Sequence, residues 1–483
     1  MATEVRVGRE EATSAGFSAG FTSVEREFPD PVELPVEGRM PAWLTGSVVR
    51  SGPAKFEADG RSVRHWFDGL ALLDRFGVQD GRATYTSRML ESGAYRAASK
   101  KGEISYQEFA TDPCRSLFKR FVSAFSPRPT DNANVNVAPD GHNWVAMTET
   151  PLQVEFDPQT LETVGVRDYD DRLKVHHATA HPHHDAARGE LLSYAIAYGP
   201  RSRYQLFRLP DGSRRRERYA QTWVNQPCYM HSFALTERYA VLTDQPLTVN
   251  PMELLVSGRP FIENFRWRDD RGTRFLVFDR GDGSLVGTYE TEPFFTFHHV
   301  NAFERGGEVV IDACTYDDAG IVEALYLERL RAGEPPPQSR MRRYRIDLVS
   351  GRAERETEFE TSMELPRIDY RRRNGRDYRF AWGASARGEG SSWFDQIAKL
   401  DVTTGEAMTW HADGCYPGEP VLVREPGADG EDAGVILSVV LDGRREASFL
   451  VVLDARTMEE LARAEAPLRL PPGFHAQFGP DLV

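Results

Sequence analysis

Four of the twelve histidines stand in apolar or aromatic surroundings, and together they could bind a metal ion. His181 lies in TAHP, His231 in YMHSF, His298 in FHHVN and His475 in GFHAQF. A buried imidazole costs free energy unless it is hydrogen-bonded or bound to a metal, and any one of these alone is more often an ordinary core histidine. A set of imidazoles suits iron, copper, nickel or zinc, and the sequence spacing does not choose among them. Four imidazoles with two open positions would suit an Fe(II) ion that must bind O2.

Three glutamates lie in partly apolar surroundings where a solvated carboxylate would be unusual: Glu149, Glu364 and Glu419. Imidazoles that bind a metal usually donate their second N–H group to an acceptor, which fixes the tautomer. We therefore consider the three carboxylates as acceptors for the histidines and as charges that offset a divalent cation. A glutamate in a surface loop is the usual alternative.

The elements that would position these residues are short β-strands. Long helical patterns are scarce, and a strand–turn–strand unit recurs in which an apolar run ends in Asp and a short turn follows. The Asp residues are Asp157, Asp279, Asp347, Asp401 and Asp454. The last three units are spaced as expected for four-stranded blades. The repeats favour a β-propeller over a sandwich, and in a propeller the inner strand ends of different blades converge on the central axis.

The chain reads as one long domain with a polar start. Residues 1–25 are rich in Gly, Ser and Glu and are predicted to be a flexible tail. Residues 26–483 are predicted to form a single propeller domain. Larger gaps between the early repeats predict inserted segments at about residues 100–130 and 245–265.

Composition excludes several classes of protein. The net charge of -14, from 59 basic and 73 acidic residues, disfavours a general nucleic-acid binder. The four cysteines are far apart and form no CxxC pair, which argues against a zinc knuckle or a thioredoxin-like site. The N-terminal residues lack the apolar core of a secretory signal, and no apolar run is long enough to span a bilayer. We expect a cytoplasmic enzyme.

Several segments match one known family. They are GRMPAWLTG, HWFDGLAL from His65, TDNANVNV from Thr130, TAHPH, MHSFALTERY, FHHVNAFE and the terminal FHAQF. On these segments, which extend from about residue 30 to 478, the chain resembles the carotenoid cleavage oxygenases. It is most similar to the branch that holds the animal central β-carotene oxygenase and the retinal-pigment-epithelium isomerohydrolase.

The resemblance implies a seven-bladed β-propeller, with Fe(II) on its axis and a cap of helices and loops over a substrate tunnel. The residues that match the metal ligands are His181, His231, His298 and His475. The same matching pairs Glu149 with His231, Glu364 with His298 and Glu419 with His475, and leaves His181 without a carboxylate. The other histidines of these segments would not be ligands: His65, His176, His177, His183, His184 and His299.

The implied chemistry is oxidative cleavage of a conjugated C=C bond in an apolar polyene, with O2 as co-substrate and two carbonyl products. Thr148 matches a residue whose methyl group leans toward the open coordination position. Phe109, Tyr229 and Tyr316 match residues of the substrate tunnel, although ordinary core aromatics are equally consistent with them. No GxSxG elbow, P-loop or GxGxxG fingerprint suggests other chemistry.

Three alternatives stay open. One is a stilbene-cleaving dioxygenase, although the lysine with which such members hold the substrate phenol is absent near Thr130 and Asp131. Another is a non-oxidative isomerohydrolase that uses the iron as a Lewis acid. The last is a propeller that binds an apolar ligand without turnover, a function that would not need the four histidines. Two departures bear on the substrate: the segment after Phe109 is shorter than expected, and Tyr316 replaces a tunnel tryptophan of the isomerohydrolase.

Residues 113–128 read as an amphipathic basic stretch. Leu117, Phe118, Phe121 and Phe125 are interleaved with arginine and lysine, a pattern suited to the interface of a bilayer. A polyene partitions into lipid, so we expect this patch to hold the tunnel mouth at the inner face of a membrane. An insertion packed on the propeller is the alternative. Cys114 matches a position that can be lipidated in the animal isomerohydrolase, a modification that we do not predict here.

Overall fold

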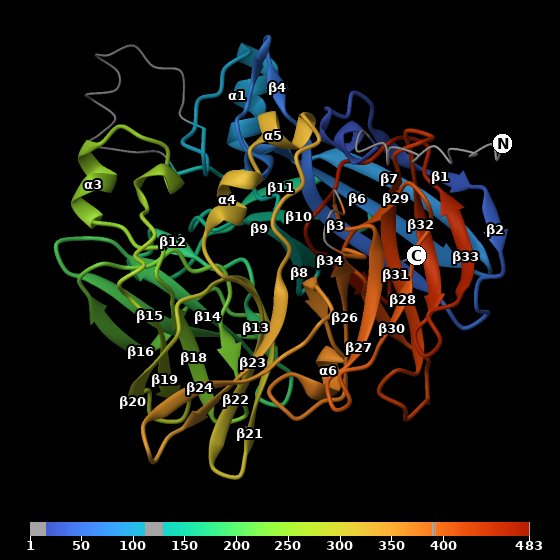
Figure 1. Cartoon of the computed structure of the whole chain (residues 1–483). Helices are drawn as coiled ribbons and strands as arrows, with labels where there is room; N and C mark the ends of the chain where they lie inside the picture. The colour runs from blue at the N-terminus through green and yellow to red at the C-terminus, as the bar shows by residue number, and fades with distance from the viewer. Residues whose placement is uncertain (1–15, 112–128, 389–390, 392, 483) are drawn as a thin grey trace, which may run out of the picture.

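Seven antiparallel β-sheets are arranged as the blades of a propeller (Figure 1). The computed structural model describes residues 16–111, 129–388, 391 and 393–482. The predicted all-β fold and its seven blades are confirmed. The predicted membrane patch at Leu117, Phe118, Phe121 and Phe125, together with Cys114, lies outside the described residues.

The first four blades follow one another along the chain, apart from β34, which the C-terminal part of the chain adds to the first blade. The first contains β1 (Phe28–Leu34), β7 (Arg82–Met89), β6 (Leu70–Gln79), β3 (Gly46–Lys55) and β34 (Ala476–Gly479). The second contains β8 (Asn136–Asp140), β9 (Asn143–Met147), β10 (Val154–Phe156) and β11 (Thr163–Val166). The third contains β12 (His177–Ala178), β13 (His183–Asp185), β14 (Glu190–Ala197), β15 (Ser202–Pro210) and β16 (Glu217–Val224). The fourth contains β17 (Ala234–Leu235), β18 (Tyr239–Asp244), β19 (Thr273–Asp279) and β20 (Leu285–Thr291).

Three further blades complete the ring. The fifth contains β21 (Phe295–Arg305), β22 (Glu308–Tyr316), β23 (Arg340–Asp347) and β24 (Arg352–Glu358). The sixth contains β25 (Glu364–Arg367), β26 (Phe380–Ser385), β27 (Gln396–Asp401) and β28 (Ala407–Trp410). The seventh contains β29 (Cys415–Pro417), β30 (Val421–Arg424), β31 (Gly434–Asp442), β32 (Ala447–Asp454), β33 (Glu460–Glu465) and β2 (Val36–Gly38). A separate small hairpin joins β4 (Glu57–Ala58) and β5 (Arg61–Ser62).

Both ends of the described chain close the ring. β34, near the C-terminus, pairs with β3 of the first blade, with Val48 opposite Phe478. β2, near the N-terminus, pairs with β33 of the seventh blade, with Val36 opposite Ala464. Each closing blade therefore contains strands from both ends of the described chain, which ties these two ends into one ring.

The recurring Asp residues cap the turns between the last two strands of five blades. In the turn from β23 to β24, the Asp347 carboxylate accepts hydrogen bonds from the backbone N–H groups of Val349 (2.8 Å) and Ser350 (3.0 Å). Asp157, Asp401 and Asp454 bond two backbone N–H groups in the same way, and Asp279 bonds one. Gly351, which has a φ of 76°, completes the turn in a conformation that favours glycine.

Short helices gather over one end of the propeller (Figure 1). They come mainly from segments between strands. They are α1 (Gly93–Lys101), α3 (Pro251–Val256), η3 (Ile262–Asn264), α4 (Gly320–Ala324) and α5 (Leu327–Arg331). The short 3-10 helix η2 (Trp66–Asp68) precedes all of these in the sequence. α6 (Tyr370–Arg373) lies elsewhere, between β25 and β26. The helices and their loops supply much of the wall of the cavity described below.

The expectation of a flexible tail over residues 1–25 is wrong for its described part. η1 (Phe17–Phe21) is a short 3-10 helix whose two phenylalanines are fully buried. The Phe17 ring stacks on Trp393 at 5.5 Å, and Phe21 meets the same indole edge-on at 5.3 Å. The polar residues around them suggested a mobile segment, but two aromatic side chains are enough to anchor it because each buries a large apolar area.

Candidate metal centre

Four imidazoles converge where the inner strands of four blades meet. His181 follows β12, His231 precedes β17, His298 lies in β21, and His475 comes directly before β34. One nitrogen of each lies within 4.8 Å of those of the others. The Nε2 atoms of His181 and His231 are 2.8 Å apart, and those of His298 and His475 are 3.2 Å apart. The four histidines are far apart in the sequence, and the propeller fold brings their side chains together.

Three of the four histidines are held by a buried glutamate through Nδ1. The distance from Nδ1 to the carboxylate oxygen is 2.6 Å for His231 and Glu149. It is 2.5 Å for His298 and Glu364, and 2.7 Å for His475 and Glu419. A carboxylate accepts, so each Nδ1 carries the proton and each Nε2 lone pair faces the cluster. These are the pairs that the sequence comparison implied, and no carboxylate holds His181 among the described residues.

The glutamates are themselves held by different donors. The Tyr229 hydroxyl donates to both oxygens of Glu149, at 3.0 and 3.1 Å, and the Tyr316 hydroxyl donates to Glu364 at 3.1 Å. Glu419 instead accepts from the guanidinium of Arg367 at 2.8 Å and from the backbone N–H of Ala476 at 2.8 Å. One carboxylate of the site therefore carries a buried ion pair, and the other two are held by neutral phenols.

Burial and neighbouring charges set the protonation of the site. Burial, with the neighbouring His475 and His231, lowers the pKa of His181 well below its usual value. Burial also lowers the pKa of His475, to about 4, although Glu419 acts in the opposite direction. Burial alone would raise the pKa of Glu419, but Arg367 and His475 lower it to about 2. At neutral pH these two imidazoles are thus neutral and free to donate a lone pair, beside an ionised carboxylate.

The donor set fits a divalent transition metal. Four imidazole nitrogens without a thiolate or a carboxylate ligand argue against a site built for soft metals or for calcium and magnesium. The three carboxylates are engaged by Nδ1 protons, which is the arrangement by which outer acceptors orient metal-bound histidines. We therefore treat the four histidines as a metal site.

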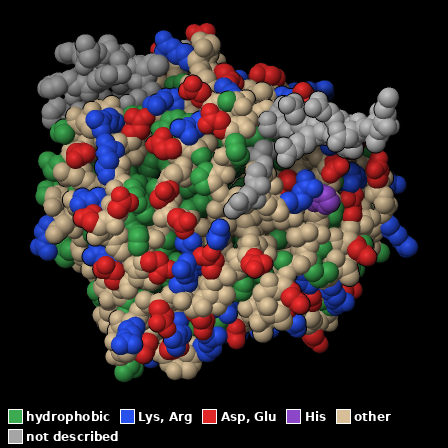
Figure 2. Space-filling model, viewed as in Figure 1, with side chains coloured by type: hydrophobic (Ala, Val, Ile, Leu, Met, Phe, Trp, Pro, Cys, Tyr) green, Lys and Arg blue, Asp and Glu red, His purple; other side chains and the backbone are tan. Residues whose placement is uncertain are grey.

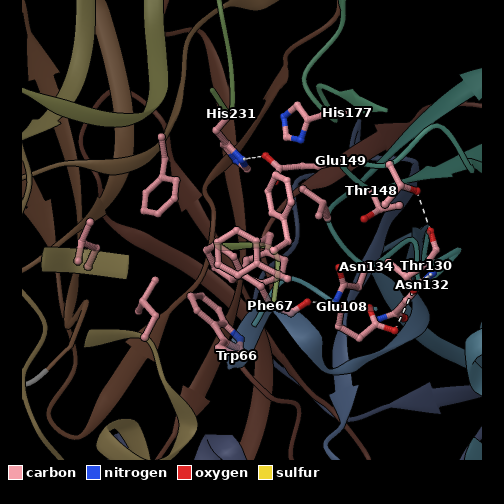
Figure 3. A pocket seen from close by; sticks show the side chains of 18 of the residues that line it. Trp66, Phe67, Glu108, Thr130, Asn132, Asn134, Thr148, Glu149, His177 and His231 are labelled. Carbon is pink, nitrogen blue, oxygen red and sulfur yellow. Dashed lines mark hydrogen bonds and ion pairs between the residues drawn. The ribbon is translucent and has the colours of Figure 1, made fainter. Parts of the chain in front are cut away.

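A mostly apolar cavity of about 440 Å³ adjoins this site (Figure 3). His231, His298 and His475 form part of its wall, together with Thr148, Glu149 and Glu364. The apolar part of the wall includes Trp66, Phe67, Phe109, Phe261, Phe297 and Phe474. Aromatic walls of this kind accommodate a long apolar ligand beside the metal site.

The predicted tunnel residues divide into two groups. Phe109 and Tyr316 line the cavity, as does Thr148, which precedes Glu149. Tyr229 is fully buried and is not among the described residues that line the cavity. Its assignment to the tunnel stays a prediction: its ring packs beside Phe109, which lines the cavity, and its hydroxyl donates to Glu149.

The remaining histidines of the matched segments have other partners. The His65 ring donates from Nε2 to the carbonyl of Val322, at 3.0 Å, and accepts the backbone N–H of Phe67. His177, which lines the cavity, donates from Nε2 to the carbonyl of Met230 at 2.9 Å. His183 and His299 are bonded within the propeller, whereas His176 and His184 lie in more exposed positions. None of these six belongs to the four-histidine cluster.

Two residues of the site were missed in the sequence. Arg367 stands three positions after Glu364, and its partner Glu419 belongs to the next blade. Glu108, a buried glutamate of the cavity wall, directly precedes Phe109. Glu108 could have been found from its place directly before Phe109, whereas the pairing of Arg367 with Glu419 depends on how adjacent blades meet.

On the face of the molecule shown in Figure 2, acidic and basic side chains are interspersed. Within the described ranges, the chain has no helix with the length and apolarity needed to cross a membrane.

Comparison with known proteins identifies the family. The profile described as retinal pigment epithelial membrane protein matches residues 21–480. The chain is 36% identical to the mitochondrial carotenoid-cleaving dioxygenase of Mustela putorius furo, over 95% of each chain. It is 32% identical to the beta,beta-carotene 15,15'-dioxygenase of Gallus gallus, over 95% of this chain and 98% of that one.

Solved structures agree on the fold. A variant of the Synechocystis apocarotenoid oxygenase superposes with a TM-score of 0.85 at 23% identity, covering 98% of this chain and 100% of that one. At this identity the structural similarity supports the fold alone. The family is shown by the profile match and by the similar sequences described above. The chain belongs to the family of the retinal pigment epithelial membrane protein, which is that of the carotenoid cleavage oxygenases.

Proposed function

We propose that this protein cleaves a conjugated C=C bond in a carotenoid or apocarotenoid with Fe(II) and O2, giving aldehyde or ketone products. The observation that carries the proposal is the position of three metal-site histidines in the wall of an aromatic cavity. The relatives named for carotenoid cleavage support the same substrate class.

The residues present would divide the work as follows. His181, His231, His298 and His475 would hold the iron, and Glu149, Glu364 and Glu419 would orient three of these imidazoles. When bound, Fe(II) supplies the redox chemistry with O2, and both oxygen atoms of O2 are accounted for by the two carbonyl groups formed. Phe109 and Tyr316 would position the polyene, and the apolar wall would keep water away from it. Thr148 would shape the space next to the metal.

The site gives little support to a stilbene substrate. No lysine is among the described residues that line the cavity, so the cationic grip on a phenol is not seen there. A non-oxidative isomerohydrolase would not incorporate oxygen atoms from O2 into its products. The experiment with labelled O2 described next therefore tests this alternative as well.

The decisive experiment is anaerobic loading with Fe(II), followed by β-carotene or an apocarotenal in detergent micelles under air. Chromatography should detect aldehyde products, and their length gives the bond that is cleaved. With labelled O2, oxidative cleavage places the label in the carbonyl groups. Iron bound without any product, or products without label, would reject oxidative cleavage. His298→Ala is the matched negative control.

We also propose that the enzyme is cytoplasmic and works at the inner surface of a membrane, where its substrate partitions. The support is the amphipathic sequence around Phe118 and Phe121. Phe118→Asp with Phe121→Asp should weaken binding to liposomes and leave the iron content unchanged. Equal binding of parent and variant to liposomes would reject this part of the proposal.

A further inference from the structure

One carboxyl group in the cavity wall has no role in holding the metal site. Three glutamates line the cavity, and two of them, Glu149 and Glu364, accept from metal-site histidines. The third, Glu108, accepts a hydrogen bond from the Thr130 hydroxyl at 2.9 Å and is only 6% exposed. No arginine or lysine forms an ion pair with it in the part of the chain that the structure describes. A buried acid without a cationic partner is costly, so its presence needs an explanation.

The polar groups around Glu108 are already engaged. The Thr130 hydroxyl, which donates to Glu108, also accepts the backbone N–H of Asn132 at 3.0 Å. The Asn132 side chain accepts from the backbone N–H of Ala71 and donates to the carbonyl of Gly69, both at 2.9 Å. In Figure 3 the side chains of Glu108, Thr130 and Asn132 lie together on one side of the cavity, apart from His231. They form a polar group in a mostly apolar wall.

The state of Glu108 follows from its surroundings. Burial raises the pKa of its carboxyl group well above the usual range, and the nearby Asp68 adds to this effect. A neutral carboxylic acid that accepts at one oxygen from Thr130 carries an O–H group on the other, and that group is a donor. A protonated carboxyl group in an apolar site is thus suited to donate to an oxygen atom of a ligand.

We propose that Glu108 recognises an oxygen-bearing end of the polyene by donating a hydrogen bond to its hydroxyl or carbonyl oxygen. This inference rests on the proposed function, and it narrows the substrate to carotenoids or apocarotenoids that are oxygenated at one end. A plain hydrocarbon ring in the same place would remove the last access of the carboxyl group to water without replacing the lost hydrogen bond. Sites with such buried polar groups discriminate against ligands that lack the matching atom.

The test compares β-carotene with its dihydroxylated counterpart, which differs only by a hydroxyl group on each ring. Binding is measured anaerobically on the iron-loaded protein by quenching of tryptophan fluorescence, because Trp66 and Trp393 line the cavity. Turnover is measured under air as kcat/KM. We expect the parent to favour the hydroxylated carotenoid by roughly tenfold, since one buried hydrogen bond is gained.

Two substitutions at Glu108 separate recognition from packing. Glu108→Gln keeps a donor and should keep most of the preference. Glu108→Leu removes the donor and should abolish the preference, mainly by improving the binding of β-carotene. Thr130→Val is the matched control, because it removes the local hydrogen bond and leaves the acid in place, so the preference should survive.

The outcomes decide between the two proposals. Equal affinity of the parent for both carotenoids, or a loss with Glu108→Leu that is the same for both, would overturn the role of Glu108. A preference that Glu108→Leu abolishes, without cleavage of either carotenoid by the iron-loaded parent, would support Glu108 and reject the proposed function. Cleavage of both carotenoids without any preference would support the proposed function and reject the role of Glu108.

Discussion

Two carboxyl groups of this protein are equally buried and have opposite properties. Glu419, at the metal site, and Glu108, in the cavity wall, are each 6% exposed. Arg367 and His475 lower the pKa of Glu419 to about 2 against the effect of burial, whereas burial and Asp68 raise that of Glu108. The partner of a buried acid, rather than the extent of its burial, decides its charge. The arginine thus favours a charged carboxylate at Glu419 in the metal site, whereas the surroundings of Glu108 in the cavity wall favour a neutral carboxyl group.

The largest difference between the metal site and the cavity wall is expected when one histidine is removed from each. His475→Ala should abolish stoichiometric iron binding and lower turnover by at least about a hundredfold, because the metal supplies the chemistry. His177→Ala removes a histidine that lines the same cavity outside the cluster, and it should retain one iron per chain. Iron analysis together with product chromatography checks both. Full iron content in His475→Ala would contradict the assignment of the site.

The fixed charge at the metal site can be weakened through Arg367. Arg367→Met leaves the buried Glu419 without its cation, and we expect iron affinity to fall by about tenfold, as for other residues that orient metal ligands. The thermal midpoint of the metal-free protein should fall as well, because a buried ion pair has lost one partner. Arg345→Met, which breaks an exposed pair with Glu354, is the control and should change neither value. Unchanged iron affinity in Arg367→Met would show that Glu419 does not need the arginine.

The opposite pKa shifts predict opposite effects of pH on stability. The folded-state pKa of Glu108 is raised above its ordinary value of 4.5, so its contribution to stability is present below pH 4.5 and is lost as pH rises through the folded pKa. Glu108→Gln should therefore gain stability relative to the parent by up to about 1.4 kcal/mol per pH unit above pH 4.5.

The folded-state pKa of Glu419 is lowered, so its contribution is complete above pH 4.5 and is lost only as pH falls toward 2. The deficit of Glu419→Gln should thus be constant from pH 5 to 7. Urea unfolding of the metal-free proteins at pH 5, 6 and 7 measures both trends. Parallel curves for the two variants would remove the distinction between the two acids.

The smallest expected effect comes from the hydrogen bond that positions Glu108. Thr130→Val removes the donor to Glu108 and should lower the free energy of unfolding by about 1 kcal/mol. The kcat/KM values for both carotenoids should change by less than about threefold, since the acid keeps its own O–H group. A selective loss for the hydroxylated carotenoid would mean that Thr130, rather than Glu108, meets the end group.

The parts of the fold that follow from local chemistry could be predicted from the sequence. Asp347 and its counterparts cap turns through neighbouring backbone N–H groups, so the blade repeat is visible in the chain itself. The four histidines stood out because imidazoles in apolar sequence need partners. The pairing of Arg367 with Glu419 depends on how adjacent blades meet, and no local pattern encodes it. The burial of Phe17 and Phe21 could not be predicted, because the residues around them in the sequence are mostly polar.

The closure of the ring has a consequence for the synthesis of the protein. β34 inserts beside β3, and His475, the last of the four histidines, comes directly before it. The other strands of the ring are synthesised before β34, so the ring can close only after β34 has been made. The pairing of β34 with β3 therefore closes the ring and completes the set of four histidines in one step.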